Sequence, residues 1–87
     1  MTGYELRLWR KGMHWSSDRA AEELGVSLRT WKDYENAAKV KRCVELATVT
    51  LSLAAAIPVY EDRKTSKERV INMLMTLTAS AGLRGRR

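Results

Sequence analysis

The chain has 87 residues and a mass of 9.9 kDa, which allow one domain with a single modest core. Apolar residues make up 45% of it, and 16 Lys and Arg against 10 Asp and Glu give a net charge of +6. We therefore expect a folding chain that attracts polyanions such as nucleic acid. Because Cys43 is the single cysteine, an internal disulfide and a Cys-rich zinc site are excluded, which indicates a reducing compartment. We expect Cys43 to pack in the core as a small apolar filler.

The first predicted helix begins after Thr2 and runs to about Lys11 or Gly12. Thr2 is followed three residues later by Glu5, which is the spacing of a capping box. Charged residues in this segment interrupt any apolar run, so the sequence predicts no signal peptide and a cytoplasmic location.

Two short helices are predicted next, within the segment Ser17–Asn36. Ser16 is a good N-cap for the first of them, and Gly25 can adopt the positive φ that ends it. Ser27 then caps a third helix, Leu28–Glu35. Two short helices joined by three residues predict a helix-turn-helix.

A fourth helix is predicted from Lys39 or Val40 to Pro58, which should end it. Residues 48–53 alternate between apolar and polar, so a strand there is the alternative. Leu46–Tyr60 carries no charge but is shorter than the ~20 residues that span a bilayer, so no membrane segment is expected. The predicted apolar stripe comprises Val40, Cys43, Val44, Ala47, Leu51, Ala54 and Ala55.

A last helix is predicted from a second capping-box spacing, Thr65 to Glu68, to about Ala81, with Gly82 behind it. Its apolar face is expected to hold Val70 or Ile71 with Leu74, Leu77 and Ala81, leaving Met73 and Met75 off it. The predicted organisation is therefore a helix-turn-helix domain at 1–57, a helical extension at 58–82 and a basic tail at 83–87.

The segment from Ser17 meets the joint demands of a helix-turn-helix. Its fifth residue, Ala21, is small enough for two helices to cross closely, and its ninth, Gly25, suits the turn. The positions that must face inward are apolar or aromatic: Ala20, Leu24, Val26, Trp31 and Tyr34.

The matching residues are Leu6-Arg7 with Arg10, Ser16, Ala20-Ala21, Leu24-Gly25-Val26-Ser27 and Tyr34-Glu35-Asn36. With them the chain, between Leu6 and Leu53, resembles the Cro/C1-type (XRE) helix-turn-helix family of phage repressors and antitoxins. The resemblance implies an all-α, lambda-repressor-like domain of four to five helices that binds DNA as a two-fold dimer. It also implies a structural ion pair between Arg10 and Glu35.

Three positions depart from the pattern of the family. His14 stands where a Gly commonly ends the first helix, Ser17 replaces a frequent Gln, and Ala37 replaces the Gly usual after Glu-Asn. Asn36 tolerates the left-handed conformation that such a loop can need.

The third helix is expected to lie in the major groove with its outer residues against base edges. Arg29 is the leading candidate for base recognition, because its guanidinium can form two hydrogen bonds with guanine. Asp33 either pairs with Arg29 and holds its guanidinium in place or accepts a hydrogen bond from cytosine. The predicted base-binding residues are Leu28, Arg29, Lys32 and Asp33. The predicted backbone-binding residues are Ser16, Ser17, Ser27, Asn36, Lys39 and Arg42.

The sequence thus predicts a DNA-binding transcriptional regulator, a repressor that binds a palindromic operator as a homodimer. The family resemblance alone implies that it controls its own operon, in a phage or mobile element. The dimer interface is expected in the fourth helix, the last helix or a strand at 48–53. One alternative is an antitoxin with a small protein partner, and another is an interaction module that does not bind DNA. No cofactor, metal or enzymatic activity is expected.

Overall fold

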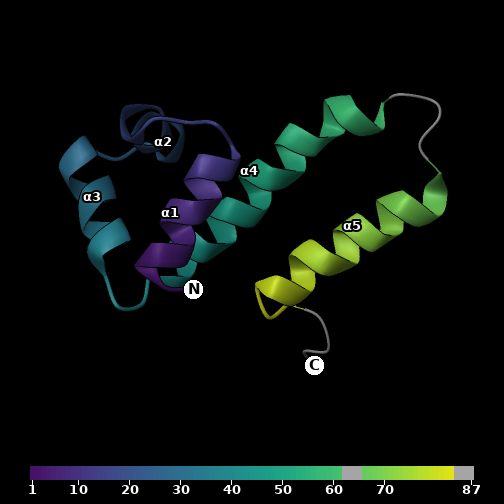
Figure 1. The fold of residues 1–87 in the computed structure, drawn as a ribbon. Helices are drawn as coiled ribbons and strands as arrows, with labels where there is room; N and C mark the ends of the chain where they lie inside the picture. The colour runs from purple at the N-terminus through teal and green to yellow at the C-terminus, as the bar shows by residue number, and fades with distance from the viewer. Residues whose placement is uncertain (62–65, 84–87) are drawn as a thin grey trace. The chain divides into compact units, whose positions relative to one another are not determined.

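The computed structural model of this chain describes residues 1–61 and 66–83, and over these residues it is all-helical (Figure 1). Its helices are α1 (Gly3–Gly12), α2 (Ser17–Leu24), α3 (Leu28–Asn36), α4 (Arg42–Tyr60) and α5 (Lys67–Ser80). The all-α class is confirmed. The alternative strand at 48–53 is wrong, because that segment lies inside α4.

The chain divides into two compact units, Met1–Glu45 and Leu46–Arg87. The division falls inside α4, whereas the sequence placed it between residues 57 and 58. Val44, in the first turn of α4, belongs to the core of the first unit, and α4 from Leu46 onward belongs to the second unit. Of the predicted tail at 83–87, residues 84–87 lie outside the described residues.

Hydroxyl caps begin the three helices of the first unit. Thr2 and Glu5 form the predicted capping box at α1. The Ser16 and Ser27 side chains accept hydrogen bonds from backbone amides three residues on, each at 3.1 Å. Gly25 ends α2 with a φ of 74°, as the sequence predicted.

The core of the first unit forms where α1, α2 and α3 meet. Trp31 and Leu6 are its largest fully buried side chains, and Ala20 and Ala21 are small enough to let α2 pack closely on them. Burying an indole of ~150–250 Å² contributes several kcal/mol to folding. The remaining members are the buried Val40 and Val44 and the partly buried Met1, Trp9, Trp15, Leu24, Val26 and Tyr34.

The first residues of the chain are fastened to the segment that follows α3. The Gly3 amide donates to the Ala37 carbonyl at 3.0 Å, and the Val40 amide donates to the Met1 carbonyl at 2.9 Å. A Cβ at Gly3 would lie 2.6 Å from the Ala37 carbonyl oxygen. Only glycine therefore permits this approach.

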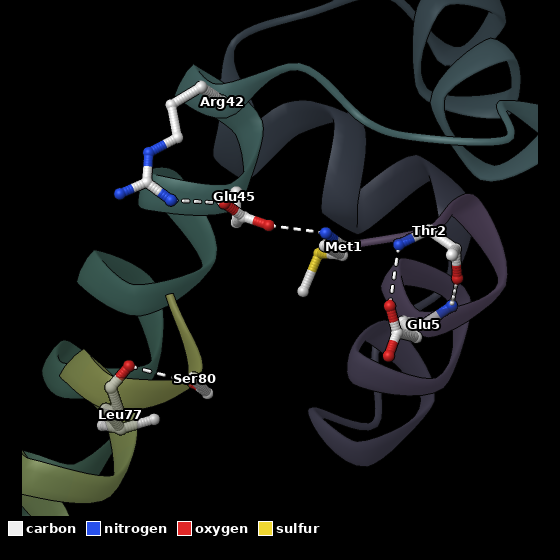
Figure 2. Close-up of polar contacts among 7 residues, drawn as sticks. All are labelled: Met1, Thr2, Glu5, Arg42, Glu45, Leu77 and Ser80. Atoms are coloured by element: carbon white, nitrogen blue, oxygen red, sulfur yellow. Dashed lines mark hydrogen bonds and ion pairs between the residues drawn. The ribbon is translucent and has the colours of Figure 1, made fainter. Parts of the chain in front are cut away.

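An ion-pair group holds the start of the chain to the first turn of α4 (Figure 2). The Met1 amino group donates to Glu45 at 2.6 Å, and Arg42 donates to the other carboxylate oxygen. Hydrogen bonds from the Met1 amino group and from Arg42 hold the pKa of Glu45 below its usual value, although burial opposes them.

The second unit consists of the remainder of α4 and of α5. Pro58 does not end α4, which continues to Tyr60. Pro58 sits in the last turn and is exposed, so the carbonyl that loses its amide partner can turn to water. The cap of α5 is Ser66, which accepts from the Arg69 amide at 3.2 Å, so this helix begins one residue later than the Thr65 spacing predicted.

In α4 and α5, some of the residues that are protected from solvent are not those predicted. In α4, Cys43 is exposed and Thr48 and Val49 are buried, which overturns the filler role predicted for Cys43. Ala54 and Ala55 are also exposed. In α5 the protected side comprises Val70, Met73, Leu77 and Ala81, so the placement of Met73 off the face and Leu74 on it was wrong.

Helix α4 is longer than Leu46–Tyr60, the uncharged segment of the sequence. It has 19 residues and is apolar enough, by length and composition alone, to cross a membrane, and 17% of the qualifying window is buried. One helix of this kind is weak evidence for a membrane span. Its exposed apolar surface does show that α4 is not the buried core helix of the second unit.

Candidate nucleic-acid interface

The outer face of α3 gathers the four predicted base-binding residues. Leu28, Arg29, Lys32 and Asp33 are exposed, whereas Trp31 is fully buried and Tyr34 is half-buried against the core. This separation follows from the helical period, because residues three and four apart share a face. Asn36 is exposed and completes that face one turn after Lys32.

The predicted ion pair between Arg10 and Glu35 is present and joins α1 to α3. The Arg10 Nε donates to Glu35 Oε2 at 2.7 Å, and each side chain is 12% exposed. The same carboxylate oxygen accepts from the Trp31 indole at 2.8 Å. A second Arg10 nitrogen donates to the Trp15 carbonyl at 3.0 Å, which ties down the segment between α1 and α2. This group fixes the orientation of α3 within the first unit.

A polar hollow of about 240 Å³ lies beside the outer face of α3. Arg7 and Lys32 contribute exposed cations to it, and neither forms an ion pair within the described part of the chain. Ser17, the first residue of α2, brings a hydroxyl at a helix N-terminus. The lining residues are Arg7, Arg10, Ser17, Lys32, Glu35 and Asn36. Since the Glu35 charge is held by Arg10, the hollow is suited to an anion.

Arg7 was missed as a site residue by sequence reasoning. It was noted only as part of the family resemblance, and it comes from α1, ten residues before Ser17. The spacing of Arg7 and Arg10 on one helix was the available signal, since residues three apart share a face. Only the packing of α1 on α3 places Arg7 near Lys32.

The other residues predicted to contact the DNA backbone differ in whether their polar groups already have a partner within the chain. Lys39 is exposed and has no ion-pair partner among residues 1–61 and 66–83. Ser16 and Ser27 use their oxygens as caps, and the Ser27 hydroxyl also donates to Thr30 at 3.0 Å. Arg42 is engaged by Glu45.

The predicted pairing of Arg29 with Asp33 is absent within the described part of the chain. Both side chains are exposed, so water solvates them and a fixed pair gains little. Among the described residues, no carboxylate pairs with the exposed Arg29 guanidinium.

Two departures from the family pattern have visible consequences. His14 takes the left-handed conformation, with a φ of 61°, at the end of α1 where a Gly is common. After α3 the backbone at Ala37 is extended, with φ −75° and ψ 145°, and Asn36 remains helical. The loop into α4 therefore needs no left-handed residue, which is why Ala37 is accommodated.

Comparison of the chain with protein-family models, with curated proteins and with solved structures finds no match. Among the described residues, no three His, Cys, Asp or Glu side chains gather as a metal site would require.

Proposed function

We propose that this protein is a double-stranded DNA-binding transcriptional regulator of the XRE helix-turn-helix type, with α3 as its recognition helix. The observation that carries the proposal is the outer face of α3, where Arg29 and Lys32 are exposed and form no ion pair with any residue that the structure describes. Its aromatic residues point inward, and the adjoining hollow supplies further positive charge. Helices docked in the major groove combine such a polar face with flanking phosphate contacts.

The exposed residues of α3 distinguish one base pair from another. Arg29 binds guanine O6 and N7 through its two-pronged guanidinium, a contact worth ~1–3 kcal/mol of discrimination. Leu28, which is 36% exposed, packs on a thymine methyl group, and Lys32 and Asp33 reach the next base pairs.

The polar hollow receives a phosphate of the DNA backbone. Arg7 and Lys32 neutralise the phosphate charge, and Ser17 and Asn36 donate hydrogen bonds to its oxygens. Such contacts fix the register of the protein on the duplex and make the affinity depend on salt. Lys39 extends the positive surface beyond the hollow.

Two copies bind an inverted repeat and repress by occluding a promoter. The dimer forms through the outer face of α5, where Ile71, Leu74 and Met75 are exposed to about the same degree, 40–42%. Two recognition helices ~34 Å apart then enter successive major grooves. Replacing Leu74 by Glu should give a monomer in sedimentation analysis. Partitioning of the chain into neutral lipid vesicles would instead assign its apolar surface to a membrane.

Selection from random duplex DNA, followed by binding titrations at two salt concentrations, tests the function. We expect a palindromic motif, loss of discrimination at one base pair in Arg29→Ala, and a smaller salt slope in Arg7→Ala. Lys67→Ala is the matched control, because this exposed lysine lies on α5 and should leave discrimination unchanged.

Selected sequences without a shared motif, or equal effects of the Arg29 and Lys67 variants, would refute sequence-specific recognition. A protein that binds no DNA would be an interaction module on the same scaffold. A small protein that co-purifies in fixed stoichiometry and alters operator affinity would specify the antitoxin form of the regulator.

A further inference from the structure

The second unit contains a groove between α4 and α5 that the proposed DNA-binding surface does not use. Its volume is about 630 Å³, within the range of ~300–1,000 Å³ typical of small-molecule sites. The lining residues are Ser52, Ala56, Val59 and Tyr60 of α4 and Arg69, Asn72, Met73, Thr76 and Leu77 of α5.

The lining has an apolar part and a polar part. Ala56, Val59, Met73 and Leu77 supply the apolar part, and 65% of Val59 remains exposed although it lines the groove. An exposed apolar wall of this kind favours an apolar occupant, because water next to it is released on binding.

The polar part consists of Tyr60, Arg69 and Asn72. None of these side chains has a hydrogen bond or ion pair within residues 1–61 and 66–83. None of the described residues that line the groove is acidic, so the Arg69 charge meets no carboxylate among them. Tyr60 ends α4 and Arg69 lies in the first turn of α5, so both belong to the end of the groove nearest the connection between these helices.

The groove is distinct from the surface assigned to dimerisation. On α5, residues 69, 72, 73 and 76 share one side at helical spacing, whereas Ile71, Leu74 and Met75 share the opposite side. A second copy docked on the outer side would therefore leave the groove side of α5 open.

We infer that this groove binds a small amphipathic carboxylate. The carboxylate pairs with the Arg69 guanidinium, and the Asn72 amide and Tyr60 hydroxyl donate to its remaining lone pairs. The apolar body of the ligand covers Ala56, Met73 and Leu77. Charge complementarity at Arg69 distinguishes this ligand from a neutral lipid or an aliphatic amine.

Isothermal titration of the full chain with sodium decanoate tests the inference, with decanol and decyltrimethylammonium as neutral and cationic probes. We expect saturable binding of decanoate alone, weakened about tenfold or more in Arg69→Ala. The Lys67→Ala variant removes an equal charge two residues away, outside the groove, and should bind decanoate as the parent does. Circular dichroism checks that each variant keeps its helices.

Ala56→Trp fills the apolar part of the groove and should abolish binding even with Arg69 in place. Absence of saturable binding, or equal binding of decanoate by the parent and Arg69→Ala, would overturn the inference. A change from dimer to monomer caused by Arg69→Ala would also overturn it, because the occupant would then be a second copy. DNA binding by the Arg29 surface is measured separately and does not depend on these outcomes.

Discussion

Replacement of Glu35 tests whether one carboxylate orients α3. Glu35→Ala would leave the Arg10 guanidinium, 12% exposed, without its anion and the fully buried Trp31 indole without an acceptor. A charge-assisted hydrogen bond contributes ~1.5–3 kcal/mol and an unsatisfied buried donor costs ~1–3 kcal/mol. We therefore expect the free energy of unfolding to fall by about 3–5 kcal/mol, which is much of the ~5–15 kcal/mol typical of a domain.

Urea titration followed by tryptophan fluorescence measures this loss, because Trp9, Trp15 and Trp31 all lie in the first unit. Glu35→Gln keeps an acceptor for Trp31 and loses only the charge, so it should cost less than Glu35→Ala. The control is Glu22→Ala, because Glu22 is exposed on α2 and its carboxylate has no partner in the described part of the chain. Equal losses in Glu35→Ala and Glu22→Ala would refute the orienting role.

Three further changes test the local structure by the same urea titration. His14→Gly should stabilise the chain by about 0.5–1 kcal/mol. Glycine adopts the φ of 61° without strain, and this gain exceeds the additional backbone entropy that glycine loses on folding. A destabilised variant would contradict this expectation. Gly3→Ala should destabilise by ~1–3 kcal/mol, because its methyl group would overlap the carbonyls that end α3, whereas Gly12→Ala meets no atom within 4 Å and should be neutral or stabilising. The pKa of Glu45 is lowered by the Met1 amino group and a neighbouring guanidinium. The ionised carboxylate therefore contributes to the free energy of unfolding above the usual carboxyl pKa, and this contribution is lost as the pH falls through the lowered pKa. Glu45→Gln should therefore destabilise at neutral pH and match the parent in acid; a pH-independent difference would contradict the pairing.

The helices of the first unit could be predicted because their signals are local. Thr2, Ser16 and Ser27 each meet a backbone amide within one turn, and Gly25 needs only its own φ. The inward positions followed from the helical period once those boundaries were set. The Arg10–Glu35 pair is different, since 25 residues separate its members, and it came from the family resemblance.

The second unit was predicted less well because α4 is apolar on several sides. When nearly every position from 46 to 60 is apolar or small, periodicity does not identify which side is covered, and Ala54 and Ala55 were placed inside wrongly. Pro58 was predicted to end α4, but it lies in the exposed last turn, where the carbonyl that it leaves without an amide partner can bond to water. The hollow that contains Arg7 depends on the packing of three helices, which no local pattern encodes.

Cys43, whose thiol is exposed in the first turn of α4, gives the chain a natural attachment point for a probe. Because the sequence holds no other cysteine, one nitroxide label enters each copy without mutagenesis. In a two-fold assembly, the paired labels would report a single intermolecular separation, with and without operator DNA. The same thiol can link two copies covalently in air, so a reductant belongs in every sample whose oligomeric state is measured.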